Sequence, residues 1–101
     1  MVNTIVNNPM VITGKLEANK EDIFVENDNI DLVGHLSGAP IKIYENDVLI
    51  DTAMTLNNGI YTYYYTPTTT GTKQIKAVFE GTKDYNRIVS SVLTVNVNAT
   101  P

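Results

Sequence analysis

Apolar and polar residues alternate along much of the chain with the period of two that is typical of β-strands. The clearest examples are residues 41–44, residues 60–66 and residues 93–97. No window of helical length places apolar residues at i, i+3, i+4 and i+7 in a way that alternation does not explain better. We therefore expect an all-β chain in which helix is nearly absent.

Turn-forming residues divide this pattern into short segments. Asn57-Asn-Gly59 and Glu45-Asn-Asp47 are expected hairpin turns, because Asn, Asp and Gly adopt the positive φ angles that tight turns require. The strands expected between the turns span residues 10–18, 22–26, 30–36, 41–44, 48–56, 60–66, 73–80 and 87–98. Seven or eight strands at such spacings predict an antiparallel sandwich of two packed sheets.

Alternation also assigns side chains to the two faces of each strand. Tyr61, Tyr63 and Tyr65 share the face expected to be buried, and Tyr85 is expected to close one end of the sandwich. His35 falls on an outward position and is expected to be exposed. The expected core comprises Leu32, Leu36, Ile41, Ile43, Tyr63, Ile75, Ala77, Phe79 and Val95.

The length of 101 residues accommodates one domain and excludes a second. Residues 1–9 are rich in Asn and end in Pro9, which favours a linker or loosely held lead-in. We expect the domain over residues 10–98 and a tail over 99–101. Neither a secretory signal nor an apolar run of about 20 residues is visible, so we interpret the chain as a piece of a larger one.

The amino-acid composition limits the kinds of binding and catalysis that the chain can perform. Thr (13) and Asn (12) are abundant, and the net charge of −4 argues against electrostatic binding to nucleic acid or to anionic lipid. Insertion into a membrane is not expected either, because no apolar run approaches the length of a membrane span. The chain has no Cys and a single His, which excludes disulfides, thiol catalysis and thiolate or multi-histidine metal sites. No nucleophile motif is present. We therefore expect no enzyme activity and no cofactor.

Clusters of Asp, Glu and Asn could supply oxygen ligands to calcium. They lie at Glu21-Asp22, Glu26–Asn29 and Glu45–Asp47. Both longer clusters fall where turns are needed and neither has the spacing of a calcium-binding loop, so turns are the preferred interpretation. Any calcium ion would bind there with weak affinity, and a neighbouring domain would complete its set of ligands.

Two further groups of residues are candidate sites. An internal Lys–Asn isopeptide bond would involve Lys15, Lys42 or Asn96, but Lys42 and Asn96 fall on solvent-facing positions and no bond is expected. Tyr44 and Tyr64 lie on the opposite phase from the core and are the candidate contacts for a ligand, because exposed aromatic rings can stack on sugars. A solitary surface aromatic is the simpler interpretation of each.

Four phrases of the sequence carry a resemblance to a known family. They are Leu36–Ile50, Asn58–Pro67, Gly71–Gly81, and Asp84-Tyr85 with Ser90-Ser91. Within the span from Leu16 to Val97, they resemble the Ig-like repeats of large bacterial and archaeal cell-surface, adhesin-like proteins, including those of methanogenic archaea. Two positions depart from the family pattern: Asp47 stands where a hairpin Gly is usual, and Lys73 stands where an apolar residue is common.

The resemblance implies an Ig-like antiparallel β-sandwich without a disulfide, in a non-catalytic module that serves as a structural spacer, a stalk or an adhesion unit. It also implies an extracellular, cell-surface location, with neighbouring repeats of the parent chain as partners. A surface glycan or protein is a further candidate partner, and the module itself is expected to be a monomer. The alternative is a carbohydrate-binding accessory module of a surface protein. At Lys73, the departure implies a less well packed end of its strand.

Overall fold

The computed structural model describes residues 2–16, 38–56, 59–81 and 85–100. These residues form strands and connecting turns without a helix, so no helix there could span a membrane. The strands are β1 (Val2–Ile5), β2 (Met10–Lys15), β3 (Pro40–Glu45), β4 (Val48–Met54), β5 (Ile60–Tyr65), β6 (Gly71–Phe79), β7 (Ile88–Val89) and β8 (Leu93–Asn98). The all-β class and the expected strand number are confirmed.

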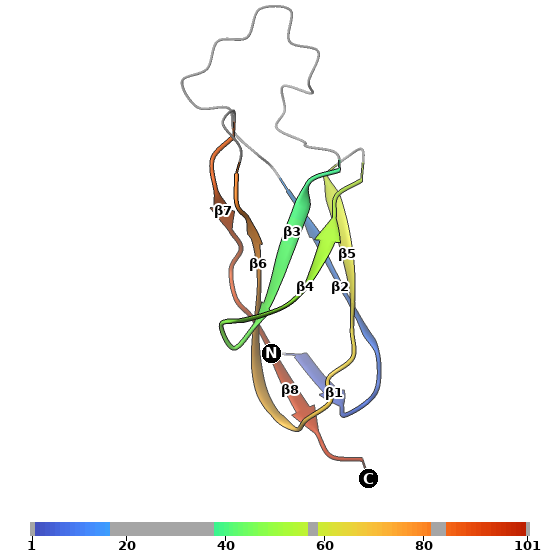
Figure 1. Ribbon diagram of the computed structural model, residues 1–101. Coiled ribbons are helices and arrows are strands. Elements are labelled where there is room, and N and C mark those ends of the chain that lie inside the picture. The colour runs from blue at the N-terminus through green and yellow to red at the C-terminus, as the bar shows by residue number, and fades with distance from the viewer. Residues whose placement is uncertain (1, 17–37, 57–58, 82–84, 101) are drawn as a thin grey trace, which may run out of the picture.

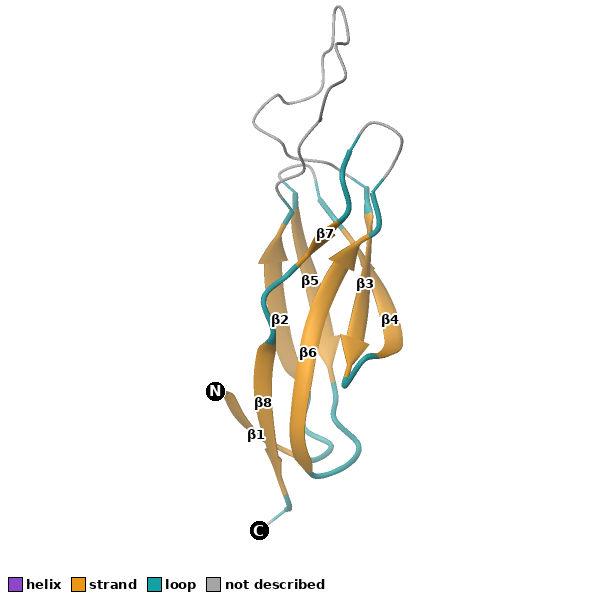
Figure 2. Cartoon of the chain, turned by 90° about the vertical axis from the view of Figure 1, so that its left-hand side faces the viewer, coloured by secondary structure: helices purple, strands orange, loops and turns teal. Residues whose placement is uncertain are grey.

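The strands form two sheets that face each other. The larger sheet has the order β1-β8-β6-β3-β4, with β7 also paired to β6, and the smaller sheet consists of β2 and β5 (Figure 1). Figure 2 shows β2 and β5 side by side in a layer separate from β6 and β3. The expected sandwich is therefore confirmed. It differs from the expectation in one pair, because β1 and β8 run parallel.

The strand β1 lies in the segment expected to be a lead-in. Val2–Ile5 pairs with β8 over four positions, and the Val6 amide extends the ladder by donating to the Asn98 carbonyl at 2.9 Å. A turn then carries the chain across to the smaller sheet, with Asn7 at a φ of 68° and its amide bonded to the Pro67 carbonyl at 2.7 Å. The structure thus places part of residues 1–9 in the sandwich itself.

The hairpin between β3 and β4 follows the prediction. Asn46 and Asp47 have φ angles of 49° and 68°, the pair of positive values that a two-residue hairpin of this twist demands. Asp47 replaces the usual Gly without disturbing the turn, because a short polar side chain tolerates the left-handed region. The Asn46 side-chain oxygen also accepts the Gln74 amide at 2.9 Å, which ties the turn to β6.

The last predicted strand is interrupted. Instead of one strand over residues 87–98, β7 and β8 are separated by residues 90–92. Ser90 holds the break: its amide donates to the Ala77 carbonyl at 2.9 Å, and its hydroxyl oxygen accepts the Ala77 amide at 2.8 Å. A serine side chain has replaced a backbone partner here, which is how Ser and Thr commonly end regular strands.

The core lies between the two sheets and agrees with the alternation. Among the residues expected there, Tyr63 and Ala77 are half-buried, and the fully buried ones are Ile41, Ile43, Ile75, Phe79 and Val95. Tyr61, Tyr65 and Tyr85 also belong to the core cluster. Tyr85 is 7% exposed, so it is buried, as its expected role in closing one end of the sandwich requires.

Lys73 overturns the expectation of a poorly packed strand end. Its side chain is buried between the sheets, with 8% of the residue exposed, and its amine donates to the Thr69 hydroxyl at 2.5 Å. The long aliphatic stem of a lysine fills apolar space while its amine reaches a polar atom. An apolar residue is therefore not needed for packing at this position.

Some expectations fall outside the described residues. They are the strands over 22–26 and 30–36 with Leu32, His35 and Leu36, the clusters Glu21-Asp22 and Glu26–Asn29, and the first two residues of the Asn57-Asn-Gly59 turn. Gly59 itself is described and has a φ of 80°, the positive value expected of it.

Candidate functional site

Tyr64 is the most exposed aromatic side chain of the described residues. It lies on the outer face of the β2–β5 sheet, in register with Val11, and the two residues are 70% and 56% exposed. The neighbours Tyr63 and Tyr65 point inward, which is the alternation that the sequence indicates. Tyr64 and Val11 thus form a small apolar surface on the smaller sheet.

Tyr44 lies on the other side of the molecule. It is half-buried on the outer face of the larger sheet, in register with Lys76, whose amine lies 5.8 Å from the centre of its ring. Lys76 also forms an ion pair with Asp47 at 3.1 Å. The ring is therefore partly covered by a cation of its own chain.

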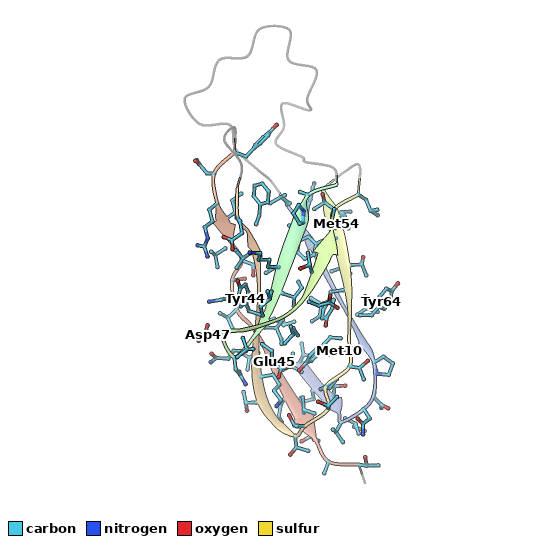
Figure 3. The ribbon with its side chains drawn as sticks, in the orientation of Figure 1. Met10, Tyr44, Glu45, Asp47, Met54 and Tyr64 are labelled. Carbon is cyan, nitrogen blue, oxygen red and sulfur yellow. The ribbon has the colours of Figure 1, made fainter. Side chains whose placement is uncertain are left out.

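The structure does not bring the two candidate ligand contacts together. Figure 3 shows Tyr44 and Tyr64 on opposite sides of the sandwich. Stacking platforms for sugars need rings that share one surface, so the two tyrosines offer separate contacts. Alternation along a strand predicts which residues point outward, but it does not predict to which sheet each strand belongs.

The oxygen atoms of the Glu45–Asp47 turn are directed to different partners. The Tyr65 hydroxyl donates to Glu45 at 2.6 Å, Asn46 accepts the Gln74 amide, and Asp47 pairs with Lys76. Within the described residues, no group of three or more Asp, Glu or His side chains is arranged to hold a metal ion. The turn interpretation of this cluster agrees with its geometry.

The residues considered for an isopeptide bond are also separate. The Lys42 amine bonds to Glu80 at 3.1 Å, and the Asn96 side-chain amide donates to Asn3 at 3.1 Å. Arg87 bonds to the second oxygen of Glu80 at 2.8 Å, and these two hydrogen bonds lower the pKa of the Glu80 carboxyl. Lys42 is therefore part of a surface ion-pair cluster.

A groove that the sequence does not indicate opens between the two sheets. It has a volume of about 330 Å³ and lies where β2 faces the break between β7 and β8. We call it the β2–β8 groove. Its apolar lining comprises Ile12, Ile43, Tyr61, Ile75, Ala77 and Leu93, and its polar lining comprises Thr13, Lys15, Lys76, Ser90 and Ser91, with Gly14 at the wall.

Gly14 allows the Tyr61 ring to form one wall of this groove. The two residues are paired across β2 and β5, and a Cβ atom on Gly14 would overlap the Tyr61 ring and hydroxyl. An aromatic ring that folds over a cross-strand glycine covers the backbone that the glycine exposes. Burial raises the pKa of the Tyr61 hydroxyl, so this group stays protonated and can donate a hydrogen bond.

Comparisons with known proteins add no assignment to this geometry. No protein-family model matches the chain, and no curated protein or solved structure matches it either.

Proposed function

We propose that this chain is a non-catalytic Ig-like module of a secreted, adhesin-like cell-surface protein, in which it acts as a structural spacer or adhesion unit. The neighbours in the parent chain would be further modules of the same kind, with a glycan or protein of another surface as a candidate ligand. The proposal takes the module as an extracellular monomer. It rests on the resemblance of Leu16–Val97 and on one structural observation, the parallel pairing of the first and last strands.

The parallel pairing supports a spacer because of how it would carry load. A pull on both chain ends draws β1 toward its own start and β8 toward its own end. In a parallel pair these directions are opposite along one axis, so the strands slide against each other and all of their hydrogen bonds share the load. In a hairpin pulled at its open end, the bonds break one after another. A module that separates other domains under tension benefits from the first geometry.

Single-molecule pulling tests this proposal, and the absence of Cys permits cysteine handles at any chosen pair of positions. Handles at residues 1 and 101 load β1 against β8, whereas handles at Pro40 and Met54 peel the β3–β4 hairpin open. We expect the terminal pull to require the larger force. Equal or smaller force in the terminal pull would contradict a load-bearing role.

Two single proline substitutions test whether the hydrogen bonds between β1 and β8 resist the force. Since the Val6 amide bonds to β8, the period of two along the ladder directs the Thr4 amide toward β8 and the Asn3 amide away from it. Thr4→Pro removes a backbone bond of the pair, while Asn3→Pro leaves the backbone ladder intact and removes only the exposed side-chain bond to Asn96. We expect the force in the terminal pull to fall much further for Thr4→Pro than for Asn3→Pro.

The carbohydrate-binding alternative draws on a single observation, the 70% exposure of Tyr64 beside Val11. An exposed aromatic ring on a flat sheet can stack on the apolar face of a sugar. Titration with a panel of polysaccharides, followed by tyrosine fluorescence, tests this function. Saturable binding that is lost in Tyr64→Ala and retained in Tyr44→Ala would favour the accessory module, and no binding at millimolar sugar would remove it.

A further inference from the structure

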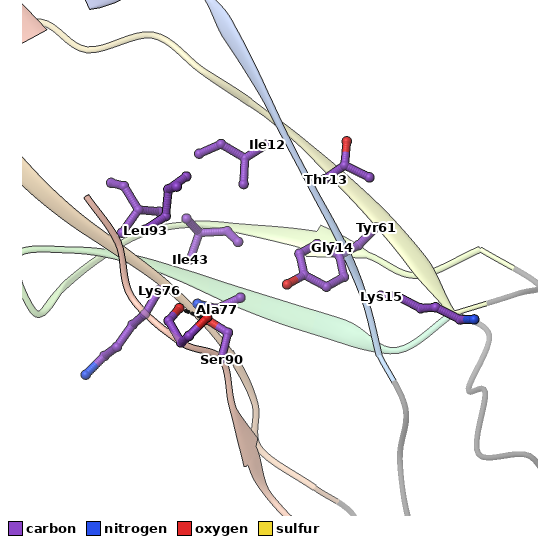
Figure 4. A pocket seen from close by; sticks show the side chains of 12 residues that line it. Ile12, Thr13, Gly14, Lys15, Ile43, Tyr61, Lys76, Ala77, Ser90 and Leu93 are labelled. Carbon is purple, nitrogen blue, oxygen red and sulfur yellow. Dashed lines mark hydrogen bonds between the residues drawn. The ribbon is translucent and has the colours of Figure 1, made fainter. Parts of the chain in front are cut away.

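The β2–β8 groove is part of a longer seam between the two sheets. A second cavity, of about 90 Å³, shares four lining residues with the groove and extends the open space along the chain from Leu93 past Ser90 to Ile88. Figure 4 shows Ile12 of one sheet and Leu93 of the other facing the same space. The half-buried apolar side chains that pack against the core from this seam are Ile12, Ala77, Ile88 and Leu93. A narrow seam of this kind, which follows the strands lengthwise, suits one further extended strand.

The first strand leads into this seam. β1 runs parallel to β8 with Val2 opposite Val95, so a strand continued backwards from Val2 places the residue directly before Met1 opposite Leu93. The residues before that one would then pass the break at 90–92. Since Val2 packs against the core, the period of two directs the first, third and fifth residues before Met1 into the seam. β1 closes the side of the sandwich at one end, and its continuation would close the side at the other end.

On the β8 side of the seam, the ladder between β1 and β8 has a next position. The Val6 amide bonds to the Asn98 carbonyl, so the period of two along β8 directs the Thr94 amide toward the side on which β1 lies. In a continued parallel ladder, the Thr94 amide would donate to the carbonyl of the residue directly before Met1. The existing pairing of β1 with β8 therefore specifies both the direction and the register of the added strand.

On the opposite side, β2 offers an edge to the same strand. The Leu16 amide bonds to the Gly59 carbonyl, so the alternation of the antiparallel ladder directs the Thr13 amide and carbonyl away from β5. Among the described residues, β2 pairs with no strand other than β5. Figure 1 shows β1 and β2 running in opposite directions, so a continuation of β1 would lie antiparallel to β2. An edge of this kind can accept a further strand.

We propose that the polypeptide which precedes residue 1 in the parent chain occupies this seam, as a backward continuation of β1. Next to Met1 its backbone bonds to Thr94, and further back it bonds to the edge of β2 at Thr13. Its alternate side chains cover the half-buried apolar residues of the seam. The inference rests on the proposed function only in taking the chain as one module of a longer protein. It adds that the connection to the preceding module begins as a docked strand, which limits how far the two modules can swing.

The test lengthens the N-terminus by about six residues in two versions that have the same composition. In the first version, valine is the first, third and fifth residue before Met1 and threonine fills the other positions. In the second version, the two residue types are exchanged, so valine points away from the seam. We expect the first version to raise the midpoint of thermal unfolding by about 4 °C or more over the unextended chain. The second version should leave the midpoint nearly unchanged.

Hydrogen exchange followed by NMR locates the added strand. In the first version, the Thr94 and Thr13 amides should exchange about tenfold more slowly than in the unextended chain. The Thr52 amide, on the edge of β4, should exchange at an unchanged rate. Equal midpoint shifts in the two versions, or unchanged exchange at Thr94, would overturn the proposal. A midpoint that rises with protein concentration would place the extension on a second copy and would overturn it as well.

Two matched prolines test the part played by β2. Thr13 and Thr52 are both exposed and lie on edges that no other described strand covers, Thr13 on β2 and Thr52 on β4. The midpoint shift caused by the first version should shrink in Thr13→Pro and persist in Thr52→Pro. Equal shifts in the two variants would contradict pairing with β2. If Thr13→Pro does not fold, the comparison of the two versions in the unsubstituted chain still decides. The pulling comparison uses the unextended chain, so a negative result here leaves the spacer function untouched.

Discussion

At the scale of single residues, the contact between Gly14 and Tyr61 restricts which side chains these two positions can carry. Gly14 lies within a strand, where glycine is ordinarily unfavourable, yet a Cβ atom there would overlap the Tyr61 ring. The cost of glycine in the unfolded chain is offset by the burial of the ring over it.

We expect Gly14→Ala to destabilise the protein by about 1 to 3 kcal/mol, because Tyr61 must leave its position or the strands must separate. Urea denaturation measures the change in the free energy of unfolding. In the background Tyr61→Leu, whose shorter side chain removes the overlap, the same substitution should cost clearly less. Equal costs in the two backgrounds would mean that the overlap is not the cause.

Replacement of Lys73, in contrast, is expected to increase the free energy of unfolding. The residue is buried and its amine donates to the uncharged Thr69 hydroxyl, and none of the ion pairs between described residues involves it. We expect Lys73→Met to stabilise the protein by about 1 kcal/mol, since methionine fills similar space without the desolvation cost. Thermal denaturation measures this. Lys42→Met, at an exposed ion pair, is the control and should not stabilise.

The inward-facing tyrosines predict a loss of stability at alkaline pH. Burial and the hydrogen bond to Glu45 raise the pKa of Tyr65, and burial raises the pKa values of Tyr61 and Tyr63. The folded state therefore holds these protons more tightly than the unfolded state, in which tyrosine titrates near pH 10. Their contribution is complete below about pH 10 and is lost as the pH rises above it.

Denaturation curves at a series of pH values from 7 to 11 measure this loss. We expect the free energy of unfolding to decline above about pH 10, with tyrosinate absorbance rising together with unfolding. Tyr65→Phe should make the decline shallower, whereas Tyr64→Phe on the outer face should leave it unchanged. A decline of equal slope in both variants would assign the alkaline effect to other groups.

At the scale of elements, β4 is an edge of the larger sheet that none of the other described strands covers. It ends the larger sheet, and Val48, Leu49, Ile50 and Met54 are all more than a third exposed. Asp51 is the one charged residue of β4, and this strand contains neither the lysine nor the proline that usually blocks edge-to-edge pairing. We expect copies of the chain to associate through β4 as the protein concentration rises.

We expect Ile50→Lys to shift this self-association to a higher concentration and to change the free energy of unfolding by no more than about 1 kcal/mol. Sedimentation velocity over a concentration series measures the shift. Thr72→Lys adds the same charge at an exposed position of β6, away from the β4 edge, and is the control. If both variants behave alike, net charge rather than the edge governs association.

The sequence predicts those elements whose signals are local. The alternation of Ile41 and Ile43 and the positive φ angles of the Asn46-Asp47 turn depend on neighbours along the chain, and both are confirmed. The strand β1 is not predicted, because Val2–Ile5 is short and acquires its partner from the far end of the chain. The β2–β8 groove is likewise absent from the pattern, since it arises where strands of different sheets meet.

The candidate ligand residues show the same limit. Alternation places Tyr64 outward, and the structure agrees, but the separation of Tyr44 from Tyr64 depends on which sheet each strand joins. Sheet membership is decided by packing between distant segments. For Lys73, the departure from the family pattern predicts poor packing, whereas the length of its side chain and the position of Thr69 decide how it packs.

At the scale of the whole molecule, the first strand is part of the domain rather than of its connection. Val2 and Val6 pack against the core, and β1 covers one edge of β8. We expect deletion of residues 1–9 to destabilise the protein by about 2 to 4 kcal/mol through lost apolar burial. Calorimetry measures the change. Deletion of residues 99–101 is the control and should have little effect, because Ala99 and Thr100 are exposed.

The pairing of β1 with β8 also sets an order of events during folding. Asn3 and Asn96 are 93 positions apart, so the pairing of β1 with β8 joins opposite ends of the chain. Contacts between residues this far apart in sequence form late in folding. In a string of similar modules, the β8 edge of each module would stay uncovered until its own β1 pairs with it. During that time the β1 of an adjacent module would compete for the same edge. Exchange of first strands between adjacent copies is then the characteristic misfolding route.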